Sequence, residues 1–242
     1  RIVYGVGSSE QIGEIITQKN AKKVAVIADS GVKKAGLVEK IQSILHAHHI
    51  ESGLFEEIES SSSIDTVDKG ALLIKEKKYD LIVSIGGGSS IDTAKAISVV
   101  VSNGGKCIDY AGVNKVKKPP MEVIAIPTTA GTSAEITDVA VIADRENKAR
   151  IGIRSPYIVP SLAIFDPLLT VTMPPNITAS TGMDALSHAI ESYTNTYTKA
   201  PTEVLALEAI RRIGEHLCHA VANGSNLEAR DNILMGSLLA GI

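Results

Sequence analysis

The sequence contains no tryptophan, and all aromatic residues together make up only 3% of its 242 residues. Proteins that bind single-stranded nucleic acid by stacking depend on aromatic side chains, so this function is disfavoured. An excess of positive charge is also lacking, because the net charge is −3 at pH 7. Neither nucleic acid nor an anionic membrane surface is therefore an expected partner.

Cysteine is nearly absent. Cys107 and Cys218 lie far apart and in no metal-binding spacing, and we interpret them as buried or half-buried free thiols in a reducing compartment. The sequence has no apolar run near the roughly 18 residues that a membrane span needs. A charged segment followed by an apolar one, as in a signal peptide, does not open it. These absences predict a cytoplasmic protein.

What the sequence does contain is an alternation of strand and helix patterns. Continuous apolar runs, typical of strands buried on both faces, lie at 23–28, 80–85 and 122–126. Helical spacing follows at 32–45, 64–74 and 91–101, and Ser63 is suited to start the second of these helices. Further strand patterns lie at 2–4, 54–55, 137–143, 151–153 and 161–165. This alternation over short loops predicts a parallel sheet with helices on both faces.

The pattern changes after Asp166 and Pro167, where the strand signals stop. Helical patterns then cover 182–194, 201–221 and 227–242. We therefore predict an α/β protein in which a Rossmann-like parallel-sheet domain (residues 1–165) is followed by an all-α domain (residues 166–242).

Both ends of the sequence are unusual for a complete domain. It begins with Arg1 rather than Met, directly before an apolar strand pattern. It ends in an apolar helical stretch, 233–242, that has no cap and no basic residue in its last turn. We expect the helical domain to be truncated in this chain.

Three consecutive glycines, at positions 86–88, follow the strand pattern at 80–85 and precede a helical pattern. Glycine lets the backbone approach a ligand closely. The N-terminus of the following helix offers backbone N–H groups and the positive end of its dipole. This combination favours pyrophosphate binding, and a tight strand-to-helix turn is the alternative.

A second loop, 127–137, follows the strand pattern at 122–126 and carries four threonines and a serine. Loops at the carboxyl ends of neighbouring parallel strands line the ligand crevice of such sheets, so two polar loops indicate one shared ligand. The alternative is a threonine-rich surface loop.

Asp29 ends the first buried strand pattern. An acid at this point of a dinucleotide fold accepts a hydrogen bond from the ribose 2′-hydroxyl and repels a 2′-phosphate. Capping of the next helix is the competing interpretation. Together with the two loops, Asp29 favours NAD over NADP.

Asp184 and His188 lie four residues apart in a helical pattern, so they project from one face of the helix. A carboxylate and an imidazole suit iron(II), zinc or manganese, although such a pair is also common as a surface contact. Two ligands do not complete a site. The other histidines are not expected to complete it: His46, His48, His49, His216 and His219.

Three segments together resemble the iron-containing (group III) alcohol dehydrogenases. Residues 86–92 are similar to the GGGSxxD nucleotide motif of that family, 127–135 to its PTTAGTxxE loop, and 182–191 to its GxDAxxHAxE metal helix. They occur in the order of the family, and the resemblance covers the whole chain. The residues that it assigns to NAD are Asp29, Gly86, Gly87, Gly88, Ser89, Asp92, Thr128, Thr129, Thr132, Thr137 and Leu168.

The resemblance implies an oxidoreductase that transfers hydride between a small alcohol or aldehyde and NAD(H), with the active site between the two domains. It implies a divalent metal that polarises the substrate oxygen, with iron(II) expected and zinc as the alternative. Asp184 and His188 become two of its ligands. The other two ligands of the family are histidines further along the chain, and this sequence ends before them. A homo-oligomer is compatible with the sequence.

Two other functions stay open. An inactive NAD-binding fragment of the dehydrogenase is one. The other is a dehydroquinate synthase-like lyase, which also uses NAD and a metal but binds a phosphorylated acid through several Lys and Arg side chains. The helical part of this sequence carries few such cations, chiefly Lys199, Arg211, Arg212 and Arg230.

Overall fold

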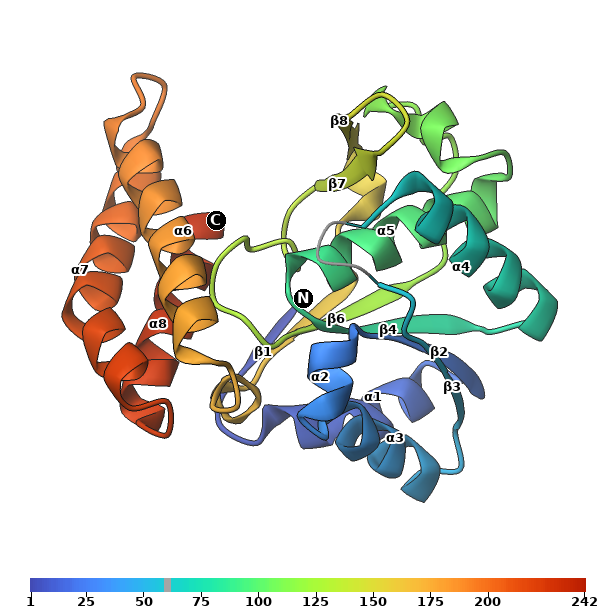
Figure 1. Ribbon diagram of the computed structural model, residues 1–242, viewed down its shortest axis with the longest axis horizontal. Coiled ribbons are helices and arrows are strands. Elements are labelled where there is room, and N and C mark those ends of the chain that lie inside the picture. Colours follow the sequence, from blue (N-terminus) through green and yellow to red (C-terminus); the bar gives the residue numbers. More distant parts are fainter. Residues whose placement is uncertain (59–61) are drawn as a thin grey trace.

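A six-stranded parallel sheet organises the N-terminal part of the computed structural model, which describes residues 1–58 and 62–242 (Figure 1). The strands, in their order across the sheet, are β1 (Ile2–Tyr4), β9 (Leu162–Phe165), β6 (Val123–Pro127), β4 (Leu81–Gly86), β2 (Lys23–Ile27) and β3 (Glu51–Phe55). Every neighbouring pair is parallel, which confirms the predicted sheet type.

Helices cover both faces of this sheet, because its central strands are apolar on both sides. Along β4, Ile82 belongs to one hydrophobic core, while Leu81 and Val83 belong to the other, as the alternation of side chains in a strand requires. The first core is closed by α4 (Ile64–Lys77) and α5 (Gly88–Asn103). The second is closed by α1 (Ile12–Gln18) and α3 (Leu37–Ala47), on the opposite side in Figure 1.

Local signals explain where some of these helices begin. Ser63 is the N-cap of α4, as predicted, and its Oγ accepts a hydrogen bond of 3.3 Å from the Thr66 N–H. The single helical pattern at 32–45 is divided by Gly36, whose φ of 75° is left-handed, into α2 (Ser30–Lys34) and α3. Short 3-10 helices lie at Ser8–Gln11, Cys107–Tyr110, Pro156–Ile158 and Pro167–Thr170.

The strand patterns at 137–143 and 151–153 form a separate small sheet rather than extending the large one. It consists of β5 (Gly112–Val113), β8 (Ala149–Arg154) and β7 (Val139–Asp144), with β7 and β8 antiparallel. Only one face of β7 is fully buried: Ala140 and Ile142 enter the core beneath α5, while Val141 is exposed. A strand with only one buried face fits a small sheet that covers a core from outside. The central strands of a parallel sheet are buried on both faces.

Beyond Phe165 the described chain contains helices and no strand: α6 (Pro175–Thr194), α7 (Ala200–Ala222) and α8 (Leu227–Gly241). Their shared core includes Ala163 and Phe165 of β9, so the helical part packs on the β1–β9 side of the sheet (Figure 1). A hydrogen bond also links the sheet to the helical part: the hydroxyl of Tyr4 in β1 donates to Asp231 Oδ1 over 2.8 Å. In the described ranges, no helix has both the length and the apolarity to cross a membrane. Cys107 and Cys218 are both free thiols, as expected, but only Cys107 is buried: Cys218 is exposed, which corrects the prediction that both would be at least half-buried.

Candidate functional site

The strand order defines where a ligand can enter the sheet. β3 lies on one side of β2 and β4 on the other, so the direction of strand succession reverses between β2 and β4. Open parallel sheets bind ligands at such a point, beyond the carboxyl ends of the strands. Asp29 follows β2, and the glycines follow β4. Two of the predicted nucleotide-binding segments therefore flank the expected crevice.

The glycine segment has a backbone that a side chain would disturb. Gly86 has a φ of 151°, and a Cβ on it would lie 2.5 Å from Ser90 Oγ. Gly87 is the N-cap of α5 and supplies no side-chain cap. The first turn of α5 thus presents its backbone donors at the crevice, as phosphate binding at a helix N-terminus requires.

The two polar loops are in direct contact with each other. A Cβ on Gly87 would lie 3.1 Å from Thr129 Oγ1, and one on Gly88 would lie 2.6 Å from Thr132 Oγ1. The Thr128 N–H donates to the Gly86 carbonyl over 3.0 Å. The two segments therefore pack tightly against each other, and the shared ligand site predicted from the sequence would lie where they meet.

Asp29 combines the two roles that its sequence position suggested. Its Oδ1 accepts from the N–H groups of Gly31 and Val32, at 2.8 Å and 3.1 Å, which caps α2. Its Oδ2 accepts from Ser90 Oγ at 3.2 Å. The capping interpretation therefore holds, and the second bond ties the carboxylate to the first turn of α5. Contact with a ribose stays a prediction.

Asp92, the last residue of the glycine motif, is engaged elsewhere. Its Oδ2 accepts from the Val141 N–H at 3.0 Å, and its Oδ1 lies 3.7 Å from Lys95 Nζ. Burial raises the pKa of Asp92, and the charge of Lys95 opposes this shift. These contacts join α5 to β7, and contact of Asp92 with the nucleotide stays a prediction.

Leu168 lies in the 3-10 helix that follows β9, where its N–H donates to Asp166 Oδ1 over 3.1 Å. The same carboxylate accepts from Ser9 Oγ at 2.6 Å and so fixes the end of β9 to the N-terminal segment. Leu168 is partly exposed. Its role at the nucleotide stays a prediction.

The predicted metal pair lies on the helix that contacts the second loop. A Cβ on Gly131 would lie 3.0 Å from Thr181 Cβ, so the loop packs against α6 at this residue. Asp184 and His188 follow Thr181 by three and seven residues and share its face of the helix. Asp184 Oδ1 and His188 Nε2 are 3.7 Å apart. The pair thus lies about one to two helical turns along α6 from the residue at which the helical part contacts the second loop.

The chemistry of this pair fits a divalent ion that is also held by other ligands. The side chains of Asp184 and His188 are 44% and 49% exposed, so both can turn toward a common ion without a large desolvation cost. Within the described part of the chain, no group of three or more His, Cys, Asp or Glu side chains could hold a metal. His216 contacts Glu215 instead, and His46, His48 and His49 are exposed at the end of α3.

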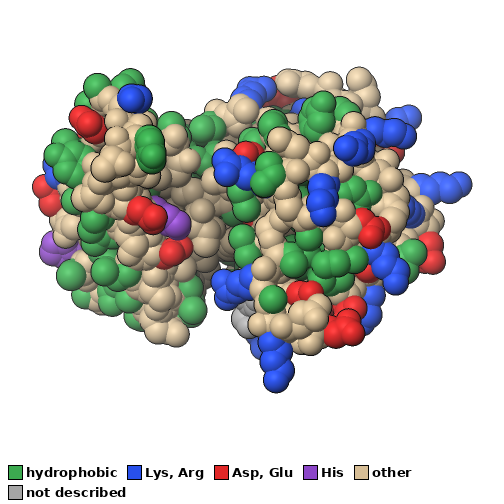
Figure 2. Space-filling model, turned by 90° about the horizontal axis from the view of Figure 1, so that it is seen from above, with side chains coloured by type: hydrophobic (Ala, Val, Ile, Leu, Met, Phe, Trp, Pro, Cys, Tyr) green, Lys and Arg blue, Asp and Glu red, His purple; other side chains and the backbone are tan. Residues whose placement is uncertain are grey.

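The second loop is also held from the side of α8. Ser133 Oγ donates to the Ser237 carbonyl over 2.8 Å, and Ser237 Oγ donates to the Gly131 carbonyl over 3.4 Å. The loop therefore lies between the sheet and the helical part. Figure 2 shows the surface hollowed between these two parts of the molecule.

Sequence analysis did not identify Lys95 or Glu135 as site residues. Both side chains are buried, and they lie on α5 and in the second loop. Burial raises the pKa of Glu135 to about 7. One signal was available: Lys95 is the single cation in the largely apolar helical pattern at 91–101.

Comparison with known families agrees with this arrangement. Residues 1–167 match the family described as iron-containing alcohol dehydrogenase, and residues 178–242 match the C-terminal part of the Fe-containing alcohol dehydrogenase family. The chain is 40% identical over 240 residues to the NAD-dependent methanol dehydrogenase of Bacillus methanolicus. This match covers 99% of the present chain and 63% of the relative.

Solved structures show the same likeness. The crystal structure of a 1,3-propanediol oxidoreductase is similar with a TM-score of 0.96 and 36% identity, over 99% of this chain and 63% of that one. Sulfoacetaldehyde reductase from Bifidobacterium kashiwanohense, solved in complex with NAD+, gives 0.94 and 31%, over 99% and 64%. The chain thus spans a little under two thirds of the length of these relatives. It belongs to the iron-containing alcohol dehydrogenase family.

Proposed function

We propose that this chain provides the nucleotide site and part of the metal site of an NAD-dependent alcohol dehydrogenase. The reaction transfers hydride between a small alcohol or aldehyde and NAD(H). One observation carries the proposal: a single loop, 127–137, contacts the glycine segment through Thr129 and Thr132 and contacts α6 beside Asp184 through Gly131. The elements suited to nucleotide and to metal therefore meet at one place.

The residues of this chain bind and orient the reactants. The first turn of α5 offers its N–H groups to the pyrophosphate, and the threonine hydroxyls of the second loop hold the rest of the dinucleotide beside it. The proposed nucleotide contacts are Asp29, Gly86, Gly87, Gly88, Ser89, Asp92, Thr128, Thr129, Thr132, Thr137 and Leu168. Asp184 and His188 would hold a divalent ion, iron(II) by expectation and zinc as the alternative, which would supply the positive charge that lowers the pKa of an alcohol.

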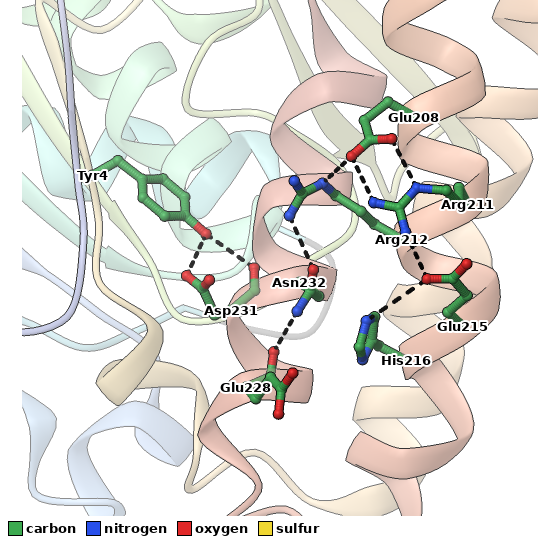
Figure 3. Close-up of polar contacts among 9 residues, drawn as sticks. All are labelled: Tyr4, Glu208, Arg211, Arg212, Glu215, His216, Glu228, Asp231 and Asn232. Carbon is green, nitrogen blue, oxygen red and sulfur yellow. Dashed lines mark hydrogen bonds and ion pairs between the residues drawn. The ribbon is translucent and has the colours of Figure 1, made fainter.

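The contacts of the arginine side chains in the helical part argue against the lyase alternative. Arg211 pairs with Glu208 and Glu215, and Arg212 pairs with Glu208 and Asn232, as Figure 3 shows. Arg230 is buried and bonds to two backbone carbonyls and one hydroxyl. These arginines are committed within the fold, so a phosphorylated acid would find few free cations. A homo-oligomer and a cytoplasmic location stay predictions from the sequence.

A direct assay tests the proposed activity. Because Asp184 and His188 alone do not complete a metal site, the assay uses protein extended to the length of its relatives. It is incubated with NAD and simple primary alcohols, with iron(II), with zinc or with a chelator, and NADH is followed by absorbance. We expect NADH formation that depends on the metal and disappears with the chelator. NADH binding without any turnover would instead support the inactive NAD-binding form. Turnover that the chelator does not affect would contradict the metal site.

The choice between NAD and NADP is expected to depend on Asp29. Because Asn caps a helix as well as Asp does, D29N removes the charge and keeps the cap of α2. We expect D29N to weaken the preference for NAD over NADP about tenfold, as the loss of one close charge repulsion predicts. The ratio of kcat/KM for the two cofactors measures this effect. A wild-type protein that uses both equally would show that Asp29 does not select the cofactor.

A further inference from the structure

Ser133, in the second loop, has a backbone conformation that serine rarely adopts. Its φ is 53°, in the left-handed region where a residue with a Cβ is strained. Among the residues that the structure describes, six non-glycine residues have a positive φ, and five of them are exposed. Ser133 is the sixth and is 3% exposed. A strained residue persists where the surrounding structure holds it, so the contacts of Ser133 indicate its role.

Those contacts lead to the last turns of α8. Ser133 Oγ donates to the Ser237 carbonyl over 2.8 Å, and Ser237 Oγ donates back to the Gly131 carbonyl over 3.4 Å. Four residues further along α8, a Cβ on Gly241 would collide with the Cβ of Ser133. Residues 237 and 241 share one face of the helix, because they are four positions apart. This face therefore holds the backbone of the loop at 131–133.

The preceding residue, Thr132, contacts the glycine segment instead. A Cβ on Gly88 would lie 2.6 Å from Thr132 Oγ1. Two consecutive loop residues thus contact different parts of the molecule, since Gly88 begins α5 in the sheet domain and α8 belongs to the helical part. A change in the backbone at Ser133 would move Thr132 relative to the glycine segment. The position of α8 is in this way transmitted to the predicted nucleotide site.

We propose that Ser133 is a positioning residue that couples occupancy of the nucleotide site to the packing of α8. This inference rests on the proposed function, because it assumes that the glycine segment and the second loop bind NAD(H). Ser133 contacts no ligand in this scheme. Its hydroxyl bond holds the loop in the shape that places Thr132. Because a coupling free energy is reciprocal, nucleotide binding stabilises the contact with α8 as much as that contact favours nucleotide binding.

Two substitutions at Ser133 separate the hydroxyl bond from the strained backbone. S133A removes the bond and leaves a Cβ in the left-handed region. S133G also removes the bond but relieves the strain, because glycine adopts positive φ readily. The control is S98A, because Ser98 is buried on α5 and its hydroxyl donates to the Lys95 carbonyl of the same helix over 2.7 Å. S98A thus removes a buried hydroxyl bond that lies within one helix.

NADH fluorescence reports the dissociation constant, and hydrogen–deuterium exchange reports the coupling. In the wild type, we expect NADH to slow amide exchange at 233–241 of α8 as well as in the loop. S133A should raise the dissociation constant about threefold to tenfold, as the loss of one hydrogen bond predicts, and should reduce the protection of α8. S133G should bind NADH within about twofold of the wild type but lose that protection. S98A should match the wild type in both measurements.

Wild-type protein that binds NADH without any added protection of 233–241 would overturn the inference. Full protection of α8 in both S133A and S133G would overturn it as well, and so would an equal loss of affinity in S98A and S133A. If the wild-type protein does not bind NADH, the proposed function fails. The inference is then judged without ligand: faster exchange at 131–135 in S133A supports the hold of α8 on the loop, and unchanged exchange contradicts it.

Discussion

Replacing His188 with alanine is expected to abolish metal-dependent turnover while leaving NADH binding intact. His188 and Asp184 are the two side chains of α6 that face a common point from one side of the helix, 3.7 Å apart. Loss of a residue that merely supports a metal ligand costs about tenfold to a hundredfold in affinity or activity. Loss of a ligand itself should exceed that range. The same result is expected for D184N, which keeps the shape of the side chain and removes its charge.

The measurement compares metal content per chain, NADH formation and NADH affinity. S187A is the matched control, because Ser187 is exposed on the same helix and its hydroxyl bonds only to the Met183 carbonyl. It should bind metal and turn over like the wild type. H188A protein with normal metal content and normal turnover would exclude this pair as ligands. Loss of NADH binding in H188A would mean that α6 also shapes the nucleotide site.

The sequence predicted the chemistry of the site better than its geometry. The glycine segment, the second loop and the Asp184–His188 pair were recognisable because each depends on residue types at short spacings. Strand order depends on how distant segments pair, and no local pattern shows that β4 lies between β2 and β6. The reversal of strand order that defines the crevice was therefore visible only in the structure.

Contacts between distant segments explain the other differences. The strand pattern at 137–143 was indistinguishable from a strand of the main sheet until its pairing with β8 was known. The bond from the Val141 N–H to Asp92 comes from a segment almost fifty positions away, so the sequence did not show that Asp92 also joins α5 to β7. Lys95 was overlooked because a lysine in a helix is usually at the surface. Its burial beneath 134–139 became visible only in the structure.

Arg230→Met is expected to be the most destabilising substitution in the helical part. Arg230 is 2% exposed, and its guanidinium joins three segments that meet at the base of α6. It donates to the Gly224 carbonyl at 2.9 Å, to Thr178 Oγ1 at 2.7 Å and to the Met173 carbonyl at 3.1 Å. Methionine fills similar space but offers no donor to these acceptors, and the Met173 carbonyl keeps only the longer bond of 3.4 Å from Thr178 Oγ1.

An unsatisfied buried acceptor costs roughly 1–3 kcal/mol, so we expect R230M to lose about 3–5 kcal/mol of unfolding free energy. Urea denaturation followed by circular dichroism measures this loss. R211M is the control, because Arg211 makes only exposed ion pairs with Glu208 and Glu215, and salt bridges of this kind contribute little to stability. Since α6 carries Asp184 and His188, R230M should also weaken metal binding, even at urea concentrations well below its denaturation midpoint. R211M should bind metal like the wild type. Equal midpoints for R230M, R211M and the wild type would show that the three segments hold together without Arg230.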